Sequence, residues 1–339
     1  MPDILACVPQ DRRPAARAAL AQAFGPETVS AVAPVTGGAS GALTYRVEAD
    51  GRAYLLRLET PVRNGLRDPR RSFACMTTAA EAGLAPALHH ADPETGVAIM
   101  DFVDQKPLAD YPGGRPALAR DLGRLIARLQ ATPAFPPVAD YPQVVQGLFA
   151  YIRGSGLFAP GLLTPHAEVL TRLCAAYRYD GPQVSSHNDV NPRNILFDGE
   201  RLWLIDWELS FRSDPLVDIA ILAIESAPTP ELEAALFEGW LGHAPDAAMQ
   251  ARYALVQRLT TLFYACLLLA FSASLPREAP DSDLTALTLE AFTAALAEGR
   301  LSGPSPELLY TVGKMRLADF LQGADTPEFE DALAKVHHG

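Results

Sequence analysis

Several features that mark particular classes of protein are missing from this sequence. The chain has only four cysteines in 339 residues, and no two of them form a Cys-x-x-Cys pair. A cysteine metal cluster is therefore not expected, and the thiols are expected to serve as small apolar residues in a reducing compartment. No internal repeat occurs at solenoid spacing, and no segment has a low-complexity pattern. The cysteines are Cys7, Cys75, Cys174 and Cys266.

Positive charge is also scarce. The chain carries 28 Lys and Arg residues against 40 Asp and Glu residues, which gives a formal net charge of −12 and a pI of about 5.0. An acidic chain repels the phosphate backbone of nucleic acids, so no nucleic-acid partner is expected. The acidity suits a cationic small substrate slightly better than an anionic one.

Neither a signal peptide nor a membrane anchor is indicated. Residues 1–13 have an aspartate early and arginines late, which is the reverse of the order in a signal peptide. Residues 259–275 reach the lower length limit for a membrane span, but they include two threonines and two serines. We interpret this run as a buried helix and expect a cytoplasmic protein with no membrane partner.

Hydrophobic residues make up 49% of the chain, which is enough for a proper core, and the length suggests two domains or lobes. Short strand-like runs at 43–47, 54–58 and 97–102 predict a small antiparallel sheet, preceded by a helix at 12–24 and accompanied by a helix at 70–82. An Asp-Gly pair at 50–51 predicts a hairpin. After residue 107, apolar spacing predicts helices at 116–132, 141–152, 165–177, 230–241, 247–274, 283–298 and 306–321.

One segment interrupts this helical part. Residues 186–211 read as a loop, a strand pair and a turn, and loops on rigid strands often carry function. His187 and Asp189 form a His-x-Asp pattern, and Asn194 follows five residues after Asp189, the spacing of a kinase catalytic loop. A hairpin then returns the chain to Asp206. A carboxylate and an amide oxygen that converge there suit Mg²⁺, which prefers oxygen ligands.

These residues carry a resemblance to a known family. The segment 186–220 resembles the catalytic core of the aminoglycoside phosphotransferase and choline kinase superfamily, and most of all its choline and ethanolamine kinase branch. The resemblance implies an α+β, bilobal protein-kinase-like fold. An N-terminal nucleotide-binding lobe would span 1–104, and a mainly helical C-terminal lobe would span 105–339.

By matching position, the resemblance implies that Asp189 is the catalytic base and that Asn194 and Asp206 hold magnesium. Asp218, in an Asp-Pro-x-x-Asp-x-Ala run, would brace the catalytic loop. His187 is expected to hold the loop by hydrogen bonds rather than to contact substrate, and Asp198 is interpreted as a turn residue. The reaction implied is transfer of the ATP γ-phosphate to a hydroxyl of a small-molecule alcohol.

The N-terminal third supplies the expected nucleotide contacts. Glycine-rich residues 37–41 precede a strand and would let backbone amides approach phosphate oxygens. Arg57, a charge inside an apolar strand, would grip phosphate bidentately. Residues 97–103 resemble the hinge between lobes, whose backbone would bind adenine. The residues predicted to bind ATP are Gly38, Ser40, Gly41, Arg57, Met100 and Phe102.

One departure from the family pattern is visible. The small-lobe helix usually supplies a glutamate to the strand cation, but the helix at 70–82 has none at its start, and Glu81 lies near its far end. Either Asp68 substitutes for it, or Arg57 is organised in another way.

The acceptor stays open. Trp207 and Glu208 follow the predicted metal ligand, so Glu208 could meet an acceptor cation, and choline, ethanolamine, thiamine, an amino sugar or another small alcohol are all compatible. An aminoglycoside or sugar kinase and a nucleotide-binding module without turnover are the alternatives. A protein kinase is disfavoured, because no Ala-Pro-Glu activation segment follows Asp206. The oligomeric state and the pathway are not predicted.

Overall fold

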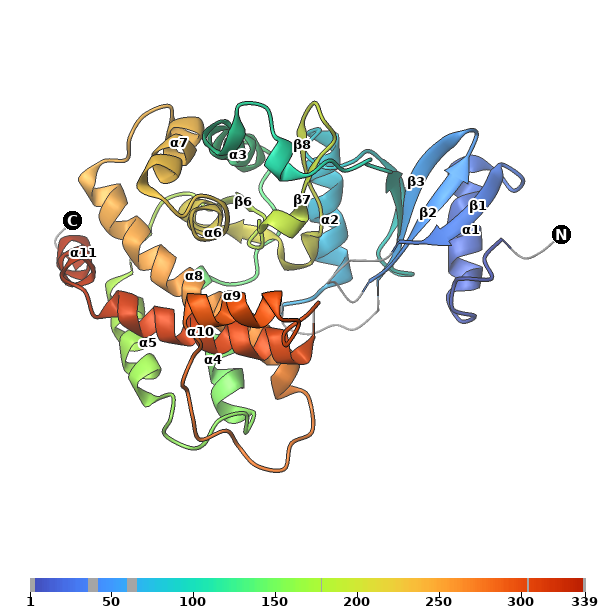
Figure 1. The fold of residues 1–339 in the computed structure, drawn as a ribbon. Coiled ribbons are helices and arrows are strands. Elements are labelled where there is room, and N and C mark those ends of the chain that lie inside the picture. Colours follow the sequence, from blue (N-terminus) through green and yellow to red (C-terminus); the bar gives the residue numbers. More distant parts are fainter. Residues whose placement is uncertain (1–3, 36–41, 60–65, 178, 304, 338–339) are drawn as a thin grey trace. The chain divides into compact units, whose positions relative to one another are not determined.

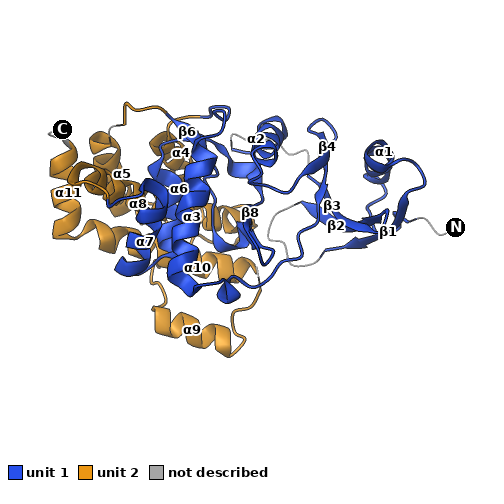
Figure 2. Ribbon diagram, turned by 90° about the horizontal axis from the view of Figure 1, so that it is seen from above, with its two compact units in different colours: residues 1–138, 183–244 blue, residues 139–182, 245–339 orange. Residues whose placement is uncertain are grey.

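A computed structural model describes residues 4–35, 42–59, 66–177, 179–303 and 305–337 (Figure 1). The chain folds into two compact units, and each is built from two separate segments (Figure 2). Unit 1 comprises Met1–Val138 and Gln183–Ala244, and unit 2 comprises Ala139–Pro182 and Pro245–Gly339. The predicted lobe boundary at residue 104 is not a boundary of these units, and the lobe division stays a prediction.

Unit 1 begins with a helix and a five-stranded antiparallel sheet, whose strand order is β1-β2-β3-β5-β4. The predicted hairpin between β2 and β3 is confirmed. Asp50 and Gly51 form its turn with φ angles of 48° and 71°, the left-handed conformations that a tight two-residue turn requires. The elements are α1 (Arg13–Phe24), β1 (Val29–Pro34), β2 (Leu43–Ala49), β3 (Arg52–Leu58), β4 (Leu88–Asp92) and β5 (Val97–Asp101).

The two faces of this sheet have different tasks. Leu56 and Ile99 belong to an apolar core that also contains Ala16, Ala19 and Leu20 of α1. Side chains alternate along a strand, so the neighbouring residues of β3 and β5 point to the opposite face. There, Leu55 pairs with Met100 and Arg57 pairs with Ala98. Arg57 therefore lies on the face that α1 does not cover.

The remainder of unit 1 combines helices with two short strand pairs. Gly123 and Gly239 let α3 and α7 approach closely, because a Cβ at either position would lie 2.2 Å or less from a backbone carbonyl oxygen of the other helix. The helices are α2 (Pro69–Glu81), η1 (Leu108–Asp110), α3 (Gly114–Gln130), η2 (Pro192–Asn194), η3 (Trp207–Leu209), α6 (Leu216–Ser226) and α7 (Pro230–Leu241). The strand pairs are β6 (Val184–Ser186) with β9 (Phe211–Ser213) and β7 (Ile195–Phe197) with β8 (Leu202–Leu204).

In its described residues, unit 2 contains helices, the loops between them and one isolated β-bridge. Its longest helix, α8, is long and apolar enough to cross a membrane, but 61% of its apolar window is buried inside the protein. Since α8 packs against α4, α10 and α11, it is a core helix of this unit, as predicted for residues 247–274. The helices are α4 (Tyr141–Gly154), α5 (Thr164–Ala176), α8 (Ala247–Ala273), α9 (Leu289–Ala297), α10 (Pro306–Ala324) and α11 (Pro327–His337).

The predicted helix at 283–298 starts too early. The Asp283 carboxylate accepts the backbone N–H of Thr285 at 2.7 Å, which makes a turn there. The helix begins only after Thr288, whose hydroxyl accepts the N–H of Ala291 at 3.2 Å and caps α9. The overall prediction of an α+β fold, with a small antiparallel sheet and a larger helical part, is confirmed.

Candidate active site

The loop after β6 is held in place by a buried carboxylate of α6. Asp218 accepts the backbone N–H of His187 at 2.9 Å and that of Asn188 at 2.8 Å. These bonds accommodate Asn188 in a left-handed conformation with a φ of 58°. The His187 ring donates from Nε2 to the carbonyl of Ile205 at 2.9 Å. Asp218 and His187 thus make the structural contacts that the sequence predicted for them.

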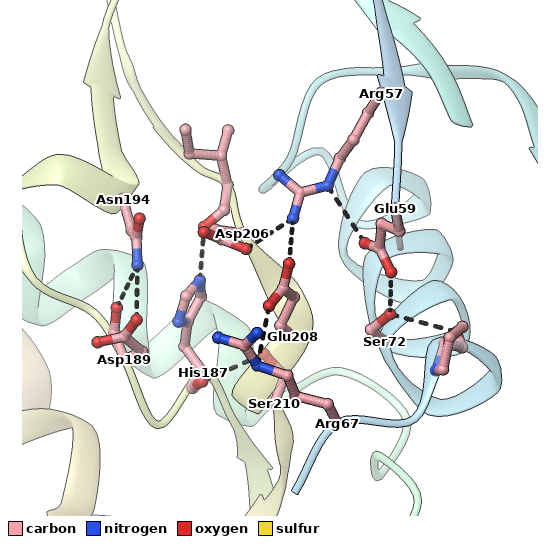
Figure 3. A network of polar contacts seen from close by, with 12 residues as sticks. Arg57, Glu59, Arg67, Ser72, His187, Asp189, Asn194, Asp206, Glu208 and Ser210 are labelled. Carbon is pink, nitrogen blue, oxygen red and sulfur yellow. Dashed lines mark hydrogen bonds and ion pairs between the residues drawn. The ribbon is translucent and has the colours of Figure 1, made fainter. Parts of the chain in front are cut away.

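Asp189 lies in this loop with two amides on its carboxylate, and Figure 3 shows that of Asn194. Asn194 donates from Nδ2 to the Asp189 carbonyl at 2.8 Å and to Oδ2 at 3.0 Å. Asn191 donates from Nδ2 to Oδ1 at 2.9 Å. Because both amide donations of Asn194 go to Asp189, its Oδ1 faces away and is available as an oxygen ligand.

The hairpin β7–β8 returns the chain to the same place, as predicted. The N–H of Ile205 donates to the carbonyl of Asn194 at 3.0 Å. Asp206 follows with φ of 68° and ψ of 72°, and this turn of the backbone ends the strand. Asn194 and Asp206 therefore come from opposite ends of one hairpin. An amide oxygen and a carboxylate form a donor set that fits Mg²⁺.

At the hairpin's turn, Asp198 behaves as interpreted from the sequence. Its Oδ1 accepts the N–H groups of Glu200 and Arg201, and its Oδ2 accepts the indole N–H of Trp203 at 2.7 Å. These bonds lower the pKa of Asp198, against the opposing effect of partial burial. Asp198 is therefore a turn residue.

Arg57 reaches from β3 to the end of the hairpin that carries Asp206. Its Nη2 donates to Asp206 Oδ1 and Glu208 Oε1, each at 2.9 Å, and its Nε donates to Glu59 Oε1 at 3.2 Å (Figure 3). Burial opposes the charge of Arg57, but the three carboxylates outweigh it, so its pKa is raised. The guanidinium is thus a fixed positive charge in the site.

The partner of the strand cation lies directly after its own strand. Glu59, two residues after Arg57, supplies the carboxylate that the start of the helix lacks. The Ser72 hydroxyl of α2 donates to Glu59 Oε2 at 3.4 Å, so α2 still contacts this pair. Asp68 does not substitute, because its carboxylate caps α2 by accepting the N–H of Arg70 at 3.1 Å.

The substrate roles predicted for Trp207 and Glu208 stay predictions, and both side chains have partners within the protein. Trp207 is only 4% exposed, and its ring lies 4.7 Å from that of His187 and 6.0 Å from that of Phe135. Glu208 uses one oxygen on Arg57 and the other on Arg67, whose Nε lies 3.4 Å away. Burial and the neighbouring Asp206 raise the pKa of Glu208, while these arginines lower it, and the net shift is upward. Glu208 therefore orients arginine side chains in this structure.

Arg71 is a further residue that the sequence reasoning missed. Its buried guanidinium donates to the carbonyls of Ser210 at 3.0 Å, Glu208 at 3.2 Å and Leu66. Burial lowers the pKa of Arg71, and two nearby acidic groups raise it less. The side chain connects α2 directly to the segment that follows Asp206.

The predicted adenine side is only partly described. Met100 is buried on the sheet face that carries Arg57, and the guanidinium of Arg46 lies 5.2 Å from the ring centre of Phe102. The N–H of Phe102 donates to Ala53 O at 3.3 Å. Contacts of this segment with a nucleotide stay a prediction. The glycine-rich residues Gly38, Ser40 and Gly41 lie outside the described residues.

A family comparison decides the class of protein. The model of the phosphotransferase enzyme family matches residues 31–255, which is more than half of the chain and includes the whole site. The chain belongs to this family. Matches to curated sequences are short: this phosphotransferase spans 20% of protein LicA from Haemophilus influenzae, at 44% identity over 52 residues, and 12% of an uncharacterized Metamycoplasma hominis protein, at 35% identity over 60 residues.

Solved structures share the fold of this phosphotransferase. A choline/ethanolamine kinase family protein from Mesorhizobium loti has a TM-score of 0.66 at 22% identity, over 97% of this chain and 100% of that one. Choline kinase LicA from Streptococcus pneumoniae has a TM-score of 0.63 at 14% identity, over 91% and 100%. A spectinomycin phosphotransferase has a TM-score of 0.52 at 11% identity, over 91% and 93%.

Together these findings confirm the predicted family and fold. The family model places the chain among phosphotransferase enzymes. Its activity as an ATP-dependent small-molecule kinase, with ATP and Mg²⁺ as cofactors, is taken up as a proposal below. The acceptor and the tasks of single residues are matters for proposal.

Proposed function

We propose that this phosphotransferase moves the γ-phosphate of ATP to the hydroxyl of a small alcohol, with a choline-like or ethanolamine-like acceptor as the first candidate. One observation carries the proposal. Asp189, Asn194, Asp206 and Arg57, which are up to 149 positions apart in sequence, are joined in a continuous arrangement within unit 1. They are the carboxylate, the metal ligands and the cation that phosphoryl transfer requires.

Asp189 acts as the base. Its carboxylate accepts the proton of the acceptor hydroxyl while the acceptor oxygen forms a bond to the γ-phosphorus. The bond between that phosphorus and the bridging oxygen breaks, and ADP leaves with the bonding electrons. The two amides on Asp189 keep its carboxylate in one orientation, which suits a reaction whose catalysis is largely positioning.

Asn194 Oδ1 and the Asp206 carboxylate would hold magnesium, which would neutralise charge on the phosphates. Among the described residues, Asp206 Oδ2 makes no hydrogen bond, so one oxygen remains for this task while Oδ1 receives Arg57. Arg57 assists from the other side. Its Nε and Nη2 are engaged by carboxylates, and Nη1 keeps two donors for phosphate oxygens.

The choice of acceptor rests on two supports. The motif around Asp189 and Asp206 resembles the choline and ethanolamine kinase branch, and a choline/ethanolamine kinase family protein and a choline kinase share the fold. An aminoglycoside acceptor is the second candidate, supported by the match to a spectinomycin phosphotransferase over 91% of this chain.

The test is ADP release from MgATP against choline, ethanolamine, thiamine, amino sugars, aminoglycosides and simple sugars. Mass spectrometry would confirm the phosphorylated product, and Asp189→Asn serves as the control. A signal that depends on one acceptor class and is lost in the variant supports the proposal. MgATP binding without any product across the panel would contradict it and favour a nucleotide-binding module.

A further inference from the structure

We propose that Asn191 is a positioning residue for the catalytic base, which the family motif of Asp189 and Asn194 does not include. The inference rests on the proposed function, because it assigns a task toward Asp189 as base. The amide of Asn191 lies two residues after Asp189 and donates to its Oδ1 at 2.9 Å.

The orientation of this amide is determined by its other partner. Asn191 Oδ1 accepts the backbone N–H of Arg193 at 3.0 Å, and a backbone N–H can only donate. The oxygen of the amide must therefore face Arg193, and its NH₂ group must face Asp189. A flipped amide would place an oxygen against the Asp189 carboxylate and an NH₂ group against an N–H donor.

The two oxygens of Asp189 are held by different residues. Asn194 takes Oδ2 and Asn191 takes Oδ1, so the pair defines the plane of the carboxylate. The Asn191 contact therefore restricts rotation about the last side-chain torsion, which has broad preferences in aspartate. In the proposed site, Asn194 would also bind magnesium, whereas Asn191 is assigned no metal. Its contribution is the alignment of the base with the acceptor hydroxyl.

Asn191 is also the N-cap of the short helix η2. This structural role is the alternative explanation for an asparagine at this position. Substitutions can separate the two roles, because Asn, Asp and Ser are about equally good at the N-cap. Asn191→Ser keeps an acceptor for the Arg193 N–H but loses the donor to Asp189. Asn191→Asp keeps the acceptor and sets a second carboxylate against Asp189.

The experiment measures kcat, the KM for ATP and MgATP affinity for the wild type and both variants, with the acceptor that turns over in the panel above. We expect kcat to fall about tenfold in Asn191→Ser and further in Asn191→Asp, with the KM for ATP and MgATP affinity unchanged. If kcat is equal in all three proteins, Asn191 serves only as the N-cap of η2, and the inference is wrong. A wild type without turnover on any acceptor would overturn the proposed function, and the inference with it.

Discussion

At the scale of single residues, the arrangement around Arg57 depends on the shape of a guanidinium. Three carboxylates engage Nε and Nη2, and Nη1 remains for phosphate. Arg57→Lys keeps the charge but has one nitrogen in place of three. Since hydrogen bonds to charged groups contribute about 1.5–3 kcal/mol each, we expect kcat/KM for ATP to fall about a hundredfold or more. Steady-state kinetics at saturating acceptor would measure this, and near-wild-type values would show that charge alone suffices.

Glu59 offers a second prediction at this scale. Glu59→Gln keeps the size of the side chain and removes the charge that faces Arg57. We expect kcat/KM for ATP to drop about tenfold, because the guanidinium loses one of its three ionic partners. Glu94→Gln is the matched control, since Glu94 pairs with Arg70 at an exposed site where ion pairs contribute little. If the two substitutions change kcat/KM for ATP equally, Glu59 has no specific role in the site.

These residues differ in how visible they are in the sequence. Glu59 could have been found, because it continues the chain directly after β3, residues two apart in an extended chain share a face, and Arg57 needed a partner. Asn191 is different: its contact with Asp189 depends on side-chain conformation within an irregular loop. Arg71 is least visible, because its partners are backbone carbonyls, two of which lie more than 130 positions away.

At the scale of elements, Arg71 couples α2 to the segment after Asp206. Arg71→Lys cannot span the carbonyls of Ser210 and Glu208 together, so buried acceptors lose their donor. We expect the free energy of unfolding to fall by about 1–3 kcal/mol. Chemical denaturation would measure the loss. The neighbouring Arg70→Lys, at a side chain 62% exposed, should stay within about 0.5 kcal/mol of the wild type. If the free energy of unfolding of Arg71→Lys is equally close to that of the wild type, the contacts of Arg71 do not contribute measurably to stability.

Elements with local signals are the ones that the sequence predicted well. The Asp50–Gly51 turn and the amphipathic helix at 116–132 both appear close to their expected positions. The helix α6 was not predicted, because eight of its eleven residues are buried and no polar face gives a helical period. α11 was not predicted either, and the start of α9 depends on turn chemistry at Asp283 that apolar spacing does not report.

At the scale of the whole molecule, we expect the free energy of unfolding to depend on pH through His166. Burial in unit 2 lowers the pKa of this histidine to about 4, from 6.5, and neither ring nitrogen is hydrogen-bonded to the side chains around it in the described chain. Between these two pKa values, His166 therefore binds a proton in the unfolded chain but not in the folded chain. Stability from neutral His166 is complete above pH 6.5 and is lost as pH falls toward 4, by up to about 3 kcal/mol.

The prediction is tested with His166→Phe, which keeps a ring to pack on Phe320 and removes the titration. Unfolding free energies of both proteins would be measured between pH 7.5 and 4.5. The wild type should lose more stability on acidification than the variant. Parallel curves would mean that His166 is protonated equally in both states.

The division into units depends on packing between distant segments, which local sequence patterns do not predict. Each unit joins two separate segments, and residues 183–244 pack with residues 1–138. Local patterns identified many strands and helices of both segments, although not α6, but they contain no information on which distant segments pack together. The hairpin that brings Asp206 to Asn194 was predictable because it is local. The contact of Arg57 with Asp206, 149 positions away, was not predicted.

The most direct test of the proposed chemistry is one measurement on Asp189→Ala: turnover of the best acceptor and MgATP binding in the same preparation. We predict that turnover falls by about 10²–10⁴-fold, because the base is gone, while MgATP binding survives, because Asn194, Asp206 and Arg57 remain. Turnover close to that of the wild type would contradict the assignment of Asp189 as the base.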